Sequence, residues 1–270
     1  MKTRILTGII LLPFLILIYF GGIPLKIGCF IISIVGMNEF FKCVMNSGAK
    51  PSFAVGYLAL ALQYIPYILL PNGTFDFSSH VELWIVFTLI ASMISGFKVN
   101  DKKPYDVMLT FFGCVYTELL PLYVAEMTMG NMKPWSWIVF IIAFGTDIFA
   151  YFTGMAIGKH KMCPNLSPKK SWEGAIGGLV FATGFSVLYA YFMFGGSMTA
   201  VKWGIIVGII GSVMSQFGDL SASAIKRQMN IKDYGKLLPG HGGILDRFDS
   251  VLFAAPTVYY LLTILGTLNK

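Results

Sequence analysis

The sequence predicts an all-α membrane protein, a polytopic transmembrane helical bundle of about nine spans with a polar cavity open to the cytosol. Three observations support this prediction. Of the 270 residues, 56% are hydrophobic and 12% are charged, and the mean hydropathy is +0.72, which is unlike an ordinary soluble domain. Apolar runs of about 18 residues or more, long enough to cross a bilayer, recur along the whole chain. The polar side chains that could carry chemistry gather beside the later runs.

Nine apolar segments follow one another along the chain, and each is predicted to form a helix. The first follows a basic start and lacks a small-x-small cleavage site, so we expect an uncleaved span. Residues 1–134 would form about five N-terminal spans and residues 135–270 about four C-terminal spans, together one integral membrane unit. The predicted spans are 5–20, 24–45, 52–70, 81–97, 106–125, 135–158, 172–194, 201–225 and 244–268.

Basic residues are distributed unevenly among the predicted loops. If the N-terminus is cytosolic, most of the 20 lysine and arginine residues fall on the cytosolic side, which is the positive-inside pattern. This predicts a multi-pass protein of a cell membrane, such as a bacterial plasma membrane, with its functional residues facing the cytosol. The net charge of +7 then reflects loops beside an anionic leaflet and implies no nucleic-acid partner. A homodimer stays open.

The end of the eighth predicted span carries a polar face. Asp219, Ser223, Lys226 and Arg227 are spaced at i, i+4, i+7 and i+8, so one helix face presents a carboxylate, a hydroxyl and two cations. The two cations alone would suit an ordinary polar helix end. A carboxylate near the membrane boundary is costly unless it is paired or binds a cation, so Asp219 favours a functional site.

The ninth predicted span begins with a second acidic face. Asp246 and Asp249 are spaced at i, i+3, with Arg247 between them. Two carboxylates this close repel each other unless a cation offsets their charge. Mg²⁺ fits, because it takes one or two carboxylates and completes its shell with water and phosphate oxygens. The alternative is a helix start stabilised by acids near its positive dipole end.

A glycine-rich turn, PGHGG at 239–243, lies between these two faces. Glycines permit positive φ and let backbone N–H groups approach an anion, and the helix start that follows adds its dipole. Lys232 and Lys236 flank the turn and strengthen the prediction of a phosphate site. His241 would either bind a phosphate or only order the turn.

A second polar region covers residues 145–174. Asp147 lies about midway along its predicted span, which favours a functional role over a structural hydrogen bond to another helix. The loop that follows brings Lys169, Lys170 and Ser171 to a predicted helix start, with Glu173 in the first turn. These charges suit a phosphate site, although topology alone would also place lysines on a cytosolic loop.

This inventory favours phosphoryl or nucleotidyl transfer. It offers acids for a metal, and cations and glycine turns for phosphates, without a Ser-His-Asp order or zinc spacing. In such reactions the protein mainly positions its substrates and neutralises charge. A substrate with a lipid tail would explain why the enzyme is built in a membrane.

The run SASAIKRQMNIKDYGKLLPGHGGILDRFD, residues 221–249, resembles the signature of the phosphatidate cytidylyltransferases, the CDP-diacylglycerol synthases. Residues 147–174 are similar to the second polar region of that family, with Ser171 where threonine is commoner and Leu166 where isoleucine is common. The residues that match the signature are Ser223, Lys226, Arg227, Lys232, Asp233, Gly235, Leu238, Pro239, His241, Gly242, Gly243, Asp246, Arg247 and Asp249.

The resemblance implies a Mg²⁺-dependent reaction of CTP with phosphatidate, within the membrane, that yields CDP-diacylglycerol and pyrophosphate. We expect the lipid phosphate to attack the α-phosphorus of CTP. The expected catalytic residues are Asp219, Asp246, Lys226 and Arg227. The expected metal ligands are Asp219, Asp246, Asp249 and Asp147, with room for a second cation left open. The expected substrate-binding residues are Ser223, Lys232, His241, Gly242, Gly243, Arg247, Lys169, Lys170, Ser171 and Glu173.

Three alternatives compete with this hypothesis. A CDP-alcohol phosphatidyltransferase should carry the run DG-x2-AR-x8-G-x3-D-x3-D, which the sequence lacks. A transporter or flippase for an anionic, phosphate-bearing substrate could use the same cations for binding without chemistry. An inactive relative could act as a scaffold, but the intact acids argue against it.

Overall fold

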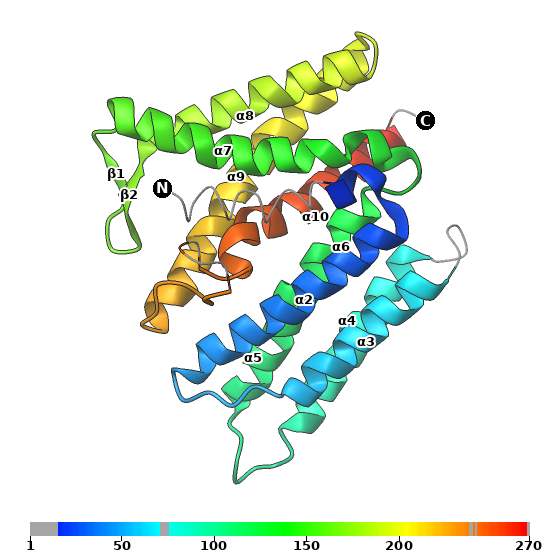
Figure 1. Cartoon of the computed structure of the whole chain (residues 1–270), viewed down its shortest axis with the longest axis vertical. Helices are drawn as coiled ribbons and strands as arrows, with labels where there is room; N and C mark the ends of the chain where they lie inside the picture. The colour runs from blue at the N-terminus through cyan, green and yellow to red at the C-terminus, as the bar shows by residue number, and fades with distance from the viewer. Residues whose placement is uncertain (1–15, 71–75, 238–239, 241, 269–270) are drawn as a thin grey trace. The chain divides into compact units, whose positions relative to one another are not determined.

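The computed structural model of the chain describes residues 16–70, 76–237, 240 and 242–268 (Figure 1). These residues are largely helical, with one small two-stranded sheet. The elements are α2 (Gly22–Met45), α3 (Phe53–Leu69), α4 (Phe77–Ser95), α5 (Pro104–Cys114), the π-helix η1 (Val115–Leu119), α6 (Leu120–Glu126), the 3₁₀-helix η2 (Gly130–Trp135), α7 (Ser136–Ile157), β1 (Lys161–Cys163), β2 (Ser167–Ser171), α8 (Trp172–Met193), α9 (Met198–Gln228) and α10 (Leu245–Leu268).

Seven helical segments within the described residues are long and apolar enough to cross a membrane. They coincide with seven of the nine predicted spans, so the polytopic helical architecture is confirmed. The predicted span 52–70 forms α3, a shorter apolar helix of 17 residues. The predicted span 5–20 lies mostly outside the described residues, and only residues 16–20 at its end are seen as helix.

The chain divides into two compact units. Unit 1 comprises Met1–Ala125 and Gln228–Arg247, and unit 2 comprises Glu126–Arg227 and Phe248–Lys270. Residues 229–244, which connect α9 to α10 and carry most of the glycine-rich signature, are called the signature loop below. The signature loop belongs to unit 1, with the N-terminal helices.

In unit 1, α2 packs against α3, α5 and η1. Aromatic side chains fill this contact: Phe40 lies 5.6 Å from Phe112 and 5.9 Å from Tyr116 between ring centroids. Gly113 makes room for them, because a Cβ there would collide with the ring of Phe41. Such close packing fixes α2, which reaches the signature loop through a side chain described below.

In unit 2, α7 and α8 run alongside each other over most of their lengths (Figure 1). Small residues allow this approach: a Cβ at Gly178 would lie 2.7 Å from the carbonyl oxygen of Thr146, and one at Gly174 would lie 2.7 Å from that of Ala150. The hydroxyl of Thr146 bonds that of Ser212 on α9 at 2.8 Å. These contacts hold α8 close against α7 and tie α7 to α9.

The loop between α7 and α8 corrects the all-α prediction. Strands β1 and β2 form an antiparallel hairpin, with Lys161 opposite Ser171 and Cys163 opposite Ser167. The turn at residues 164–166 closes it, where the N–H of Leu166 donates to the carbonyl of Cys163. The segment is too short and polar to show helical periodicity, and pairing of its two halves satisfies their backbone groups instead.

Candidate active site

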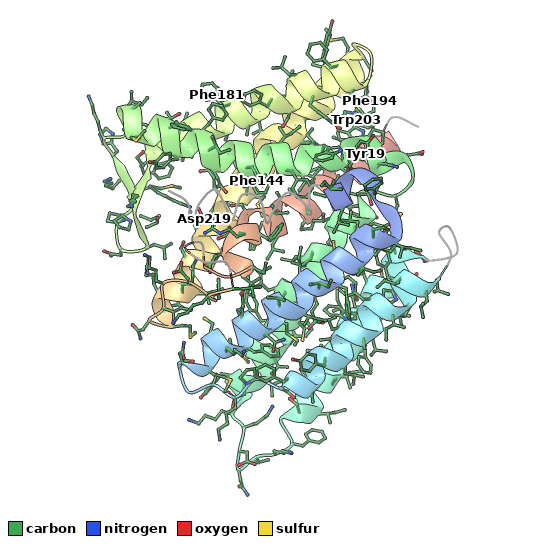
Figure 2. The ribbon with its side chains drawn as sticks, viewed as in Figure 1. Tyr19, Phe144, Phe181, Phe194, Trp203 and Asp219 are labelled. Atoms are coloured by element: carbon green, nitrogen blue, oxygen red, sulfur yellow. The ribbon has the colours of Figure 1, made fainter. Side chains whose placement is uncertain are left out.

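The C-terminal part of α9 carries the first polar group. The helix has 31 residues, about 46 Å at 1.5 Å per residue, which exceeds the apolar thickness of a bilayer and carries its end beyond it. The carboxylate of Asp219, labelled in Figure 2, pairs with the ammonium of Lys170 at 2.6 Å. The hydroxyl of Ser223 lies 3.4 Å from the other oxygen of Asp219. The polar face predicted from the spacing of these residues is therefore formed.

Two further carboxylates of unit 2 are joined by Ser250, a residue that the sequence analysis missed. The Ser250 hydroxyl donates to Asp147 at 3.0 Å, and its backbone N–H donates to the carboxylate of Asp249 at 2.8 Å. Asp249 and Ser250 are buried, whereas Asp147 is exposed. A serine after an acid at a helix start carries no distinctive signal, so sequence alone could not assign this role.

Gly218 explains how α9 approaches α10 within unit 2. A Cβ at this position would lie 2.5 Å from the carbonyl oxygen of Asp249 and 3.2 Å from the Cβ of Phe253. Only glycine tolerates so close an approach of two helix backbones. The next residue on α9 is Asp219, so this contact brings its carboxylate to the same end of unit 2 as Asp249.

The electrostatics of this acidic group are unfavourable without cations. The carboxylate of Asp249 is repelled by those of Asp219 and Asp147 and attracted by Lys226. Lys170 offsets part of the charge through its contact with Asp219. Three carboxylates with two lysines retain a net negative charge, which a bound cation would compensate.

The donors of this group are chemically suited to Mg²⁺. Carboxylate and hydroxyl oxygens are hard ligands, and Mg²⁺ commonly takes one or two carboxylates while water and phosphate complete its shell. Within the described ranges, no three Asp, Glu, His or Cys side chains converge on one metal position. As placed, this group of acids would therefore supply at most two carboxylates to one ion, and waters and substrate oxygens would complete the shell.

The hairpin residues divide between exposed charge and local structure. Lys169 is exposed, while Lys170 turns to Asp219. Ser171 is buried and caps α8, because its hydroxyl accepts the N–H of Gly174 at 3.1 Å. Glu173 contacts His160, whose Nδ1 lies 2.6 Å away. Ser171 and Glu173 thus have structural partners, and their predicted contacts with substrate remain predictions.

Arg227 lies in the last turn of α9, beside the hairpin. Its Nε donates to the carbonyl of Leu166 at 3.4 Å. The side chain is exposed. Arg227 therefore links α9 to the hairpin turn and still faces solvent, where an anion could reach it.

In unit 1, Asp246 holds the signature loop closed. Its carboxylate accepts the N–H of Tyr234 at 2.8 Å and that of Gly243 at 2.9 Å. Gly240 and Gly242 adopt φ of +77° and +83°, which glycine alone adopts at little cost. A Cβ at Gly242 would also lie 2.7 Å from the Asp246 carboxylate. The predicted role of His241 lies outside the described residues.

Glu39 on α2 is the second acid at this loop, and the sequence analysis missed it. Its two carboxylate oxygens accept the N–H groups of Ile244 and Leu245, each at 3.0 Å. With Gly243 bonded to Asp246, these N–H groups at the start of α10 already have protein partners. The sequence predicted that these N–H groups would bind a phosphate, but in the structure they already donate to the carboxylates of Asp246 and Glu39. The available signal was an acid within the apolar run 24–45.

Two cations of unit 1 stand in different surroundings. Lys232 is exposed on the signature loop. The Nε of Arg247 is buried, and no hydrogen-bond partner for it is found among the described residues. A buried charged donor without a partner is costly, which suits a group that meets an anion when substrate binds.

Comparison with known proteins gives one consistent result. The model of the Cytidylyltransferase family matches residues 2–265. A phosphatidate cytidylyltransferase of Staphylococcus haemolyticus is similar, with 33% identity over 267 residues, 97% of this chain and 99% of its own. One of Bacillus subtilis shares 32% identity over 272 residues, 98% of each chain. One of Mycobacterium tuberculosis shares 37% identity over 162 residues, 59% of this chain and 48% of its own. The chain therefore belongs to the cytidylyltransferase family.

Proposed function

We propose that this protein is a phosphatidate cytidylyltransferase, an enzyme that converts CTP and phosphatidate to CDP-diacylglycerol and pyrophosphate. The relatives that carry this name align with nearly the whole chain. The observation that carries the proposal is the group of Asp147, Asp219 and Asp249 with Lys170 and Lys226 in unit 2. Paired acids and cations of this kind suit a reaction between two phosphate-bearing substrates.

In the proposed reaction an oxygen of the phosphatidate phosphate attacks the α-phosphorus of CTP. The new P–O bond forms as the bond to the β-phosphate breaks, and the electron pair leaves with pyrophosphate. The phosphate monoester is already largely deprotonated near neutral pH, so the protein need supply no strong base. Its task is to bring two anions together and to stabilise the charge on the leaving group.

Mg²⁺ would be held by Asp219 and Asp249, with Asp147 beside them, and would neutralise phosphate charge when bound. Asp246 is a further candidate ligand, and a second bound cation is a further candidate component of the site. Lys170 orients Asp219 through their ion pair. Ser250 donates its hydroxyl to Asp147 and its backbone N–H to Asp249, and so links the two carboxylates.

The remaining cations and polar groups would bind the triphosphate and the lipid phosphate. Arg247 is the best supported, because its buried Nε lacks a partner among the described residues. Lys226 and Arg227 would act from the end of α9. The other residues proposed for substrate contact are Lys169, Lys232, Ser223 and Gly242. Gly243, expected to take part as well, already donates its N–H group to Asp246.

We further propose that the protein resides in the cell membrane with this chemistry at the cytosolic face. Seven helices of the described residues are long and apolar enough to cross a membrane, which supports a site that a phosphatidate substrate would reach from the bilayer. The basic loops suit the cytosolic side by the positive-inside rule. CTP would then reach the polar residues from the cytosol.

The direct test is product formation by the purified protein in detergent with CTP, phosphatidate and Mg²⁺. The proposal predicts CDP-diacylglycerol and pyrophosphate in equal amounts. If the protein instead moves phosphatidate or another phosphate-bearing anion across vesicle membranes without forming product, it is a transporter and the proposal is wrong.

A further inference from the structure

Glu39 reaches from α2 to the start of α10, across more than two hundred positions of sequence but within unit 1. The side chain is 8% exposed. Its two oxygens accept the N–H groups of Ile244 and Leu245, one each, at 3.0 Å. A buried carboxylate with such a bidentate arrangement fixes both position and direction of the loop end.

Two glycines of the signature loop are shaped around this carboxylate. A Cβ at Gly235 would collide with Oε1 of Glu39, and a Cβ at Gly243 would collide with both oxygens. Neither glycine has a positive φ. Their backbone would therefore accept alanine, and what excludes a side chain is the space that Glu39 occupies.

The arrangement also carries an electrostatic cost. Asp246 repels Glu39, and Lys42 on the next turn of α2 attracts it. Two acids close together in a partly buried place are retained only where hydrogen bonds compensate. Here four backbone N–H groups do so, from Tyr234 and Gly243 to Asp246 and from Ile244 and Leu245 to Glu39.

We propose that Glu39 is a positioning residue for phosphate binding by the signature loop. It fixes the end of the loop, and with it Arg247 and Lys232, in the geometry that meets substrate phosphate. Both carboxylate oxygens of Glu39 already accept backbone N–H groups, so Glu39 acts through the loop and does not contact the substrate itself. The inference rests on the proposed function, since the loop is assigned its phosphates there.

The first test is Glu39→Gln in the purified full-length protein. The amide keeps the size of the side chain, but its NH₂ group would face one of the two N–H donors. We expect the KM for CTP or for phosphatidate to rise about tenfold while kcat changes less, because the loop is misplaced by a fraction of an ångström and the acids of unit 2 are untouched. Glu82→Gln, at an exposed acid of α4, is the control and should leave both constants unchanged.

The second test displaces Glu39 without mutating it. Gly235→Ala should reproduce the rise in KM, and Gly184→Ala, at a helical glycine with no atom within 4 Å of the added Cβ, should not. In the Glu39→Asp background the shorter side chain leaves room. In that background, Gly235→Ala should raise the KM by less than about a third of the factor seen in the wild type, as expected of directly coupled residues.

Wild-type constants in Glu39→Gln, or equal effects of Gly235→Ala in the two backgrounds, would overturn the inference. Hydrogen exchange of the amides of residues 244 and 245 gives a readout independent of turnover. It should accelerate in Glu39→Gln, and unchanged exchange would also overturn the inference. A wild-type protein that forms no CDP-diacylglycerol would refute the proposed function, while the exchange comparison would still decide the loop contact.

Discussion

Replacing Gly218 with alanine inserts one methyl group between α9 and α10. The added Cβ would lie 2.5 Å from the carbonyl oxygen of Asp249, whereas ordinary van der Waals contact begins at 3.4 Å. The two backbones must therefore separate by about 1 Å, a displacement that costs on the order of 10²-fold in rate when it occurs at reacting groups. We expect kcat to fall by about this factor, because Asp219 moves away from Asp249.

The stability of the variant should change much less than its activity. Alanine gains up to about 1 kcal/mol over glycine in a helix interior, which offsets part of an overpacking cost of about 1 to 3 kcal/mol. The assay compares initial rates of CDP-diacylglycerol formation with thermal unfolding in the same detergent. Gly184→Ala is the matched control, because the same change in α8 meets no atom within 4 Å. Wild-type turnover in Gly218→Ala would refute the inferred approach of the two acids.

Three further predictions follow from the geometry. Lys170→Ala should lower kcat on the order of 10²-fold, because it releases Asp219 and removes a cation. Lys169→Ala, at an exposed neighbour, should have a small effect on kcat, and equal effects of the two changes would contradict the role of the ion pair. Asp246→Asn should abolish turnover while the protein still inserts into membranes and elutes as a folded species. One oxygen of Asp246 accepts both N–H groups of the loop, so the amide oxygen can still hold the loop, whereas the negative charge is lost; wild-type rates would remove Asp246 from the site. Lys232→Ala should raise the KM for CTP or phosphatidate. The rise should be smaller at high salt than at low salt, as expected for an exposed cation that meets a phosphate. An unchanged KM for both substrates would count against that contact.

The helical membrane architecture was predictable because burial in lipid imposes a strong and continuous pattern on the sequence. Long apolar runs admit few structures other than helices, since every backbone group must be satisfied within the segment. The spacing of Asp219 and Ser223 on one helix face was likewise predictable, because helical periodicity is local. Their contact at 3.4 Å agrees with it.

Contacts between distant segments were not predictable in the same way. Lys170 meets Asp219 only because a hairpin turns back toward α9, and the residues of that hairpin show no periodicity. Ser250 joins two acids through one hydrogen bond from α10 to α7 within unit 2. Glu39 had a usable signal, an acid in an apolar run, but its partners are backbone N–H groups that no sequence pattern displays.

The backbone N–H groups of the glycine-rich turn have other partners than the sequence motif suggested. Glycines followed by a helix start suggested free N–H groups for a phosphate. In the structure those of Gly243, Ile244 and Leu245 donate to Asp246 and Glu39. Gly240 and Gly242 are instead required by their positive φ, and Gly243 by the space that Glu39 occupies.

The central claim is that the acids of unit 2 support transfer of a cytidylyl group to a lipid phosphate. The most direct measurement follows CTP labelled at its α-phosphorus in proteoliposomes that contain phosphatidate and Mg²⁺, with the wild type beside Asp249→Asn. We expect the label to enter the lipid fraction as CDP-diacylglycerol with wild-type protein, and the rate to fall by on the order of 10²-fold or more in the variant. Label that stays in the aqueous phase with wild-type protein, or that enters lipid equally fast with Asp249→Asn, would contradict it.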